Sequence, residues 1–139
     1  MGSMDNSAAV VDSLYLLNQS DFHRQYTLDQ FNCFIVYPIL QDKIRIYYED
    51  GKPISLVTWC WFTDDEAEKF LTGEFVPEER HYARKVMDQL WGIEFIAPFG
   101  HARQTMRKMR DLSRRLYGPK ETVHFRRYYN PEKEIVRRM

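Results

Sequence analysis

The stretch KIRIYYEDGKPISLVTWCWF, which begins at Lys43, constrains the fold of this chain more than any other. From Ile44 to Tyr48, apolar side chains alternate with polar ones, as in a half-buried β-strand. The pair Asp50-Gly51 comes next, and Asp-Gly is strongly preferred in the two-residue turn of a β-hairpin. The second half, residues 54–62, is apolar almost throughout, which is typical of a buried central strand. The sequence therefore predicts a hairpin whose second strand lies inside the core of a sheet.

Two segments precede the hairpin. Residues 8–19 have helical spacing, and we expect their buried side to consist of Val11, Leu14, Tyr15 and Leu17. Residues 27–34 predict a short helix, which runs into a β segment at residues 34–39. Pro38 would interrupt that strand or place it at the edge of the sheet, because proline cannot donate to a strand ladder.

Thr63 and Glu66 form a T-x-x-E capping box, which predicts a helix that Gly73 closes. Pro77 favours the start of another helical stretch. The elements expected after the hairpin are helices at 63–73, 77–90 and 102–117, and strands at 92–97 and 121–129. The order of elements predicts an α/β fold of the α+β type, with a mostly antiparallel central sheet and helices packed on its faces.

The 139 residues fit a single domain. We expect residues 1–4 (MGSM) to be an expression scar, residues 5–130 to form one domain, and residues 131–139 to be a charged C-terminal tail. No run of 18 apolar residues predicts a transmembrane helix, and no signal peptide is recognisable. A cytoplasmic location is therefore expected, and the two cysteines, Cys33 and Cys60, are expected to be free and buried.

Charge is unevenly distributed along the chain, although the net charge is zero. Residues 1–100 carry 8 Lys/Arg against 16 Asp/Glu, whereas residues 101–139 carry 12 against 4. Such asymmetry suggests a basic surface that meets an acidic partner, whether nucleic acid, membrane or protein. The alternative is a basic C-terminal face packed beside an acidic one.

Glu94 lies within the apolar strand GIEFIA, where a buried carboxylate is costly unless it is paired. Of the four histidines, His81 is expected to be solvated, and His101 and His124 to lie on the surface. No spacing among them predicts a metal site. His23, in the segment DFHRQY, is a candidate base. Paired with Glu94 it would form a dyad, in which the carboxylate orients the imidazole and stabilises its protonated form.

Four segments resemble the RTX toxin-activating lysine acyltransferases, the family of hemolysin activators. Ser20-Asp21-Phe22-His23-Arg24 is similar to the family's segment of serine, apolar residue, catalytic histidine and arginine, and FNCFIVYPIL resembles the segment after it. KPISLVTW resembles the family's PVAYCSW strand, with Thr58 at its serine. WGIEFIAPFG resembles WFIDWIAPFG and is the most specific match. The similarity covers about residues 15–115 in the same order.

The resemblance implies a GNAT-like fold and a protein acyltransferase whose acyl donor is an acyl-acyl carrier protein, a 4′-phosphopantetheine thioester, with no bound cofactor. His23 matches the family's catalytic histidine. Glu94 stands where the family has its catalytic aspartate, which is a departure, because glutamate reaches roughly 1.5 Å further. An acceptor protein bearing target lysines and a homodimer are also implied. Thr58, Phe99 and Gly100 are candidates for stabilising an oxyanion or positioning the substrate.

The amphipathic helix at 102–117 has a basic side, on which carrier-protein docking is expected at Arg103, Arg107, Lys108 and Arg110. Two alternatives remain. A non-catalytic GNAT-like module could use the basic C-terminal half to bind an acidic protein or nucleic acid. An acetyl-CoA-dependent GNAT enzyme is the other, but its [QR]-x-x-G-x-[GA] phosphate-binding pattern is missing after the central strand.

Overall fold

A computed structural model describes residues 5–126 and the backbone of residues 137–138. One five-stranded sheet has the order β1-β2-β3-β4-β5, with strands at Ile44–Glu49, Lys52–Phe62, Gln89–Ile96, Val123–Phe125 and Arg137–Arg138. All neighbouring pairs are antiparallel except β3 and β4, which are parallel. The prediction of an α+β fold with a mostly antiparallel sheet is therefore confirmed. The predicted strand at 121–129 is seen as β4, and residues 127–129 lie outside the described part of the chain, as does most of the predicted tail.

The predicted hairpin is confirmed as β1 and β2. Asp50 and Gly51 both have positive φ, 51° and 78°, which matches the type I′ turn favoured by the twist of hairpin strands. Along β2 the side chains alternate between two hydrophobic clusters. Leu56, Cys60 and Phe62 belong to one cluster, and Val57, Trp59 and Trp61 belong to the other. The continuous apolar run of β2 is thus explained by burial on both faces.

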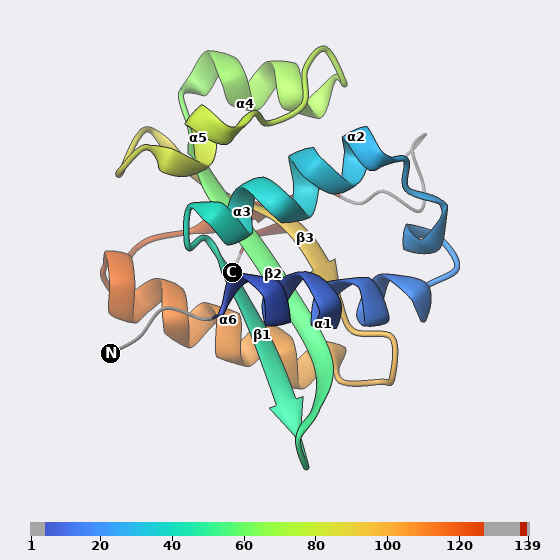
Figure 1. Ribbon diagram of the computed structural model, residues 1–139. Helices are drawn as coiled ribbons and strands as arrows, with labels where there is room; N and C mark the ends of the chain where they lie inside the picture. The colour runs from blue at the N-terminus through green and yellow to red at the C-terminus, as the bar shows by residue number, and fades with distance from the viewer. Residues whose placement is uncertain (1–4, 127–136, 139) are drawn as a thin grey trace.

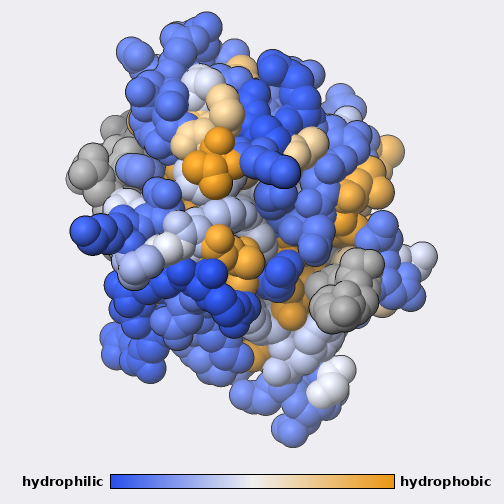
Figure 2. Space-filling model, turned by 90° about the vertical axis from the view of Figure 1, so that its left-hand side faces the viewer, coloured by the Kyte–Doolittle hydropathy of each residue, from blue (hydrophilic) through white to orange (hydrophobic). Residues whose placement is uncertain are grey.

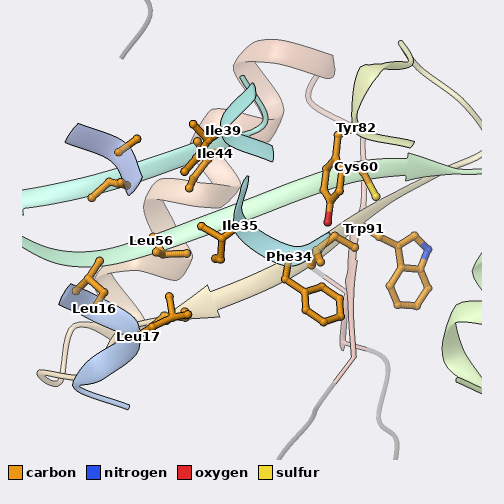
Figure 3. Packing of buried hydrophobic residues seen from close by; sticks show 14 of the residues in the cluster. Leu16, Leu17, Phe34, Ile35, Ile39, Ile44, Leu56, Cys60, Tyr82 and Trp91 are labelled. Carbon is orange, nitrogen blue, oxygen red and sulfur yellow. The ribbon is translucent and has the colours of Figure 1, made fainter. Parts of the chain in front are cut away.

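Helices cover both faces of the sheet (Figure 1). The long helix α6 (Ala102–Tyr117) packs Met109 and Leu112 on the cluster that contains Trp59. Helix α1 (Asn6–Asn18) and the helical segment of residues 28–40 pack on the other face, where Leu16, Phe34 and Ile35 meet Leu56 (Figure 3). α1 forms as predicted, but its buried side was mostly mispredicted. Ala9, Ser13, Leu16 and Leu17 are buried, whereas Val11, Leu14 and Tyr15 are exposed.

The β segment predicted at residues 34–39 is wrong, because this stretch is helical. It comprises α2 (Leu28–Phe31), a π-helical turn η2 (Asn32–Val36) and α3 (Tyr37–Leu40). The N–H of Tyr37 reaches the carbonyl of Asn32, which leaves the carbonyl of Cys33 without its usual helical donor. The hydroxyl of the buried Tyr82 donates to that carbonyl at 2.7 Å. Pro38 lies in the first turn of α3, which continues η2 directly, and because it has no N–H it cannot supply a donor to the preceding turn.

The capping box at Thr63 and Glu66 opens α4 (Asp64–Leu71) as predicted. The helix predicted at 77–90 is limited to α5 (Glu79–Ala83), and the chain becomes extended at Arg84. β3 starts at Gln89, three residues before the predicted strand, because Leu90 and Trp91 pair with Trp61 and Cys60 of β2. Burial of both side chains in the sheet outweighs the helical spacing of the segment.

Candidate active site

His23 and Glu94 meet in the structure. His23 begins η1, a 3-10 turn (His23–Gln25) shortly after α1, and Glu94 lies on β3. The Nε2 atom of His23 is 3.0 Å from the Oε2 atom of Glu94, although the two groups lack the alignment of a regular hydrogen bond. The imidazole side chain is 14% exposed and the carboxylate side chain is completely buried. The structure therefore brings together the two residues of the hypothesised dyad.

A β-bulge in β3 turns Glu94 toward His23. Glu94 pairs with Thr58 and Gly92 pairs with Trp59, so Ile93 is an extra residue with no partner of its own on β2. Trp91 and Ile96 both belong to the cluster beneath α1, although they are five positions apart. In a regular strand, residues an odd number apart face opposite sides. The bulge thus places Glu94 on the α1 side of the sheet, which accords with the frequent occurrence of bulges beside active sites.

Two neighbours hold Glu94 in place. The hydroxyl of Tyr26 donates to the Oε1 atom of Glu94 at 2.6 Å. The backbone N–H of Glu94 donates to the Oγ1 atom of Thr58 at 3.0 Å. Thr58 is fully buried, so its hydroxyl is placed to fix the backbone of Glu94 inside the sheet. No pattern in the sequence assigned Tyr26 to this site.

The hydroxyl of Ser20 contacts the opposite side of the imidazole, 2.6 Å from the Nδ1 atom of His23. With the proton of the neutral ring on Nε2, the nitrogen that faces Oε2 of Glu94, Nδ1 carries the lone pair and accepts from the hydroxyl of Ser20. Ser20, His23 and Glu94 thus form a line of hydroxyl, imidazole and carboxylate. Ser20 lies in the segment that resembles the family, but the resemblance did not assign it to the site. Its i, i+3 spacing to His23 was the available signal.

Aromatic side chains surround this line. The ring of Phe22 lies 5.0 Å from the ring of His23, edge to face, and is about half exposed. Phe99 is also about half exposed, and its ring contacts Tyr15 of α1. Gly100, next to it, has φ of 91°, a value that glycine adopts without strain. Neither Phe99 nor Gly100 touches the dyad through a contact that the structure shows.

The predicted docking residues Arg103, Arg107, Lys108 and Arg110 are all exposed on α6. α6 covers the face of the sheet opposite α1, and it begins at Ala102, shortly after β3 ends at Ile96. Arg103 and Arg107 therefore lie in the half of α6 nearer the carboxyl end of β3. Lys108 also lies over the ring of Tyr47, 5.0 Å from its centre. On the face seen in Figure 2, hydrophilic residues cover most of the surface and hydrophobic residues form small separate patches.

A second histidine–carboxylate pair is structural in character. The expectation that His81 is solvated is wrong, because its side chain is completely buried between α4 and α5. Its Nδ1 atom accepts the backbone N–H of Glu78, and its Nε2 atom lies 3.2 Å from Oε2 of Glu66. Both ring nitrogens are thus engaged. Arg84 also donates to both carboxylate oxygens of Glu66.

The pKa values of Glu66 and His81 are both lowered in this cluster. Burial would by itself raise the pKa of Glu66, but hydrogen bonds from Arg84 and Thr63 and the charge of Arg84 outweigh it and lower the pKa to about 2. Burial lowers the pKa of His81, and the charge of Glu66 only partly opposes it. Arg84 also donates to the carbonyl of Trp61 on β2, so the cluster links α4 and α5 to the sheet.

Within residues 5–126, no three His, Cys, Asp or Glu side chains converge into a group that could hold a metal ion. The helices in that part of the chain are all too short or too polar to cross a membrane. Cys33 and Cys60 are both free, and Cys60 is buried while Cys33 is partly exposed.

Comparison with known proteins adds to this geometry. The sequence pattern of the RTX toxin acyltransferase family matches residues 3–139. The chain is 30% identical over 115 residues to the lysine-acyltransferase RtxC of Vibrio cholerae, covering 79% of this chain and 70% of that protein. It is 23% identical over 123 residues to the leukotoxin-activating lysine-acyltransferase LktC of Mannheimia haemolytica, covering 87% and 68%. It is 24% identical over 109 residues to the protein-lysine myristoyltransferase RtxC of Kingella kingae, covering 78% and 64%.

Proposed function

This chain belongs to the RTX toxin acyltransferase family, and we propose that it is a protein-lysine acyltransferase. It transfers a fatty acyl group from an acyl-acyl carrier protein to lysine ε-amino groups of another protein, such as a protoxin. The names of its relatives support lysine acylation. The choice of a carrier-protein thioester as donor follows from the resemblance of its sequence segments to the family. A GNAT-like arrangement of the sheet and a cytoplasmic location belong to the same proposal.

The observation that carries the proposal is the line formed by Ser20, His23 and Glu94. A lysine amine attacks the thioester carbonyl, a C–N bond forms, and the C–S bond breaks to release the thiol of the carrier. The attacking nitrogen must lose a proton. The lone pair on Nδ1 of His23 can take it through the hydroxyl of Ser20, which lies 2.6 Å away. Glu94 then stabilises the imidazolium from the side of Nε2.

The proton later passes from the imidazolium to the departing thiolate, so that the enzyme returns to its starting state. Phe22, beside His23, and Phe99, beside Tyr15 of α1, supply exposed aromatic surface for an apolar acyl chain. Gly100 remains the candidate for placing a backbone N–H near the oxyanion. Thr58 is assigned to holding Glu94, because its hydroxyl oxygen accepts the Glu94 N–H.

The carrier docks on the basic side of α6 in this proposal. Acyl carrier proteins meet their enzymes through acidic surfaces, and the exposed cations Arg103, Arg107, Lys108 and Arg110 are complementary to such a surface. The docking surface and the dyad lie on opposite faces of the sheet, and in this proposal the thioester arm passes the carboxyl end of β3 to reach the site. Homodimer formation, which the resemblance also implies, is a separate part of the proposal.

The test is thioester loss from an acyl carrier protein loaded with a medium or long acyl chain, followed by intact-mass spectrometry. We expect turnover by the native chain and its loss in His23→Ala and Glu94→Ala. His124→Gln is the matched control, because His124 lies on β4 and contacts Leu90 and Trp91. Absence of turnover at every chain length, with all variants folded, would refute the enzyme proposal.

The exposed cations of α6 support one alternative, a non-catalytic module that binds an acidic protein or nucleic acid. Such binding would weaken steeply with salt and would not require His23. Salt-dependent nucleic-acid binding that His23→Ala leaves unchanged, together with no thioester loss, would favour the module over the acyltransferase.

A further inference from the structure

Tyr26 connects the two members of the dyad. Its hydroxyl donates to Oε1 of Glu94 at 2.6 Å. Its ring lies 5.3 Å from the ring of His23 with the planes at 73°, and its backbone N–H donates to the carbonyl of His23 at 3.1 Å. One residue thus touches the base through its ring and backbone and touches the acid through its hydroxyl.

We propose that Tyr26 is a positioning residue, whose hydroxyl orients the Glu94 carboxylate and sets how strongly that carboxylate acts on His23. This role rests on the proposed acyl transfer, because it concerns the base that the transfer uses. The carboxylate has two oxygens, and only Oε2 faces His23. A completely buried carboxylate must find donors for its other lone pairs within the protein. Tyr26 supplies such a donor to Oε1 and thereby fixes the rotation of the carboxylate about its last bond.

The ring of Tyr26 is itself held by aromatic neighbours. Its centre lies 6.1 Å from that of Phe22 and 5.7 Å from that of Phe34, which belongs to the π-helical turn η2. Phenylalanine at position 26 would keep these ring contacts and remove the hydroxyl. The substitution therefore separates the hydrogen bond to Glu94 from the packing of the ring.

The hydrogen bond also has an electrostatic consequence. A donor on a carboxylate stabilises its charged form and draws part of that charge away from other partners. Without the Tyr26 hydroxyl, the pair of Glu94 and His23 takes up its first proton more readily, whichever of the two carries it. A more basic pair at rest holds the proton longer and returns it less readily to the leaving thiolate.

The first experiment needs no substrate. The four histidine ring signals are followed by NMR across pH, and the His23 signal is assigned from a His23→Gln variant. We expect Tyr26→Phe to move the midpoint of the His23 transition to higher pH. The matched control is Tyr117→Phe, which removes a hydroxyl that contacts Trp59 on the opposite face of the sheet, and it should leave the midpoint unchanged. In a chain that already carries Glu94→Gln, adding Tyr26→Phe should leave the His23 midpoint where Glu94→Gln alone places it.

The second experiment uses the carrier-protein assay. Tyr26→Phe should lower kcat at least about tenfold, equivalent to about 1.4 kcal/mol, with little change in KM. The acid limb of its pH–rate profile should move to higher pH, whereas Tyr117→Phe should match the native chain. If Tyr26→Phe does not fold, 3-fluorotyrosine at position 26 replaces it. As a stronger donor, this residue should move the His23 midpoint to lower pH.

The two experiments fail in distinguishable ways. A shifted His23 midpoint without turnover in the native chain would refute the acyltransferase proposal and leave the coupling of Tyr26 to the dyad in place. Turnover in the native chain with the same midpoint, kcat and pH profile in Tyr26→Phe would overturn the role of Tyr26 alone. A fall in stability without any shift in the midpoint would also overturn it, because that is the signature of packing.

Discussion

Replacing Arg84 with methionine tests whether the Glu66 cluster stabilises the fold through charge. Arg84 reaches Oε1 of Glu66 at 2.5 Å and Oε2 at 3.2 Å, which is a bidentate pair. Methionine keeps most of the apolar stem and removes the guanidinium. The variant therefore isolates the ion pair from the packing that surrounds it.

The magnitude follows from the carboxyl group. The pKa of Glu66 falls from 4.5 to about 2, and at about 1.36 kcal/mol per unit this corresponds to about 3 kcal/mol for all the groups that stabilise the carboxylate. Arg84 shares that effect with Thr63 and His81, and solvent reaches part of the side chain, which is 19% exposed. We therefore expect Arg84→Met to lower the free energy of unfolding by about 1–2 kcal/mol at pH 7.

The pH dependence gives a sharper test. A carboxyl group whose pKa is lowered by folding stabilises the native state above its unfolded pKa, here 4.5, and that contribution is lost as pH falls toward about 2. Urea unfolding should thus show a gap between the native chain and Arg84→Met that is full at pH 7 and narrows toward pH 3. Arg80→Met is the control. The side chain of Arg80 is 64% exposed and its Nη2 atom lies 3.7 Å from Oε1 of Glu78, so this ion pair lies at the surface. A gap of the same size at pH 3 and pH 7 would refute the electrostatic reasoning.

Three further changes have definite outcomes. Gly92→Ala should lower the free energy of unfolding by about 1–3 kcal/mol in urea, because a Cβ there overlaps the ring of Phe125. Phe125→Leu in the same chain should recover part of that loss, and an unchanged urea midpoint in Gly92→Ala would contradict the contact. Tyr82→Phe should cost about 1–3 kcal/mol, because the carbonyl of Cys33 loses the donor that the buried Tyr82 supplies, and a neutral result would show that the carbonyl finds another partner. His81 has a lowered pKa in the folded chain, so the unfolded chain binds a proton first as pH falls below 6.5. Stability should therefore decrease from pH 7.5 to 5.5, and His81→Gln should remove that part of the decrease; the same slope in both chains would assign it to other groups.

The sequence was sufficient where a signal is local. Alternation with an Asp-Gly turn identified the hairpin, and the pair Thr63 and Glu66 identified the start of α4. The regular spacing of apolar residues in α6 identified that helix. Glu94 could be singled out because a carboxylate in an apolar strand needs a partner, and the structure supplies His23 at 3.0 Å.

The remaining features depend on contacts between distant residues. The apolar run at residues 34–39 suits a strand or a helix equally well by composition, and the hydroxyl of Tyr82 supports the π-helical alternative from 49 positions away. His81 appears polar and solvated within its acidic segment, but Glu66 of another helix pairs with it. Tyr26 and Ser20 are residues of ordinary type in a short turn. Only the folded chain shows that their hydroxyls converge on the dyad.

The extra residue in β3 also determines which face of the sheet carries the carboxylate. If all four residues 91–94 alternated regularly, without the bulge, the carboxylate of Glu94 would lie on the far side of the sheet, among Val57, Trp59 and the apolar side of α6. All the chemical groups of the dyad would still be present, but separated by the thickness of the sheet. Deleting the extra residue itself would leave Glu94 two positions from Trp91 and therefore on the same face. A register slip of one residue, by contrast, would move the carboxylate to the opposite face. The site is thus specified by the pairing register of β3 as much as by the identity of its residues.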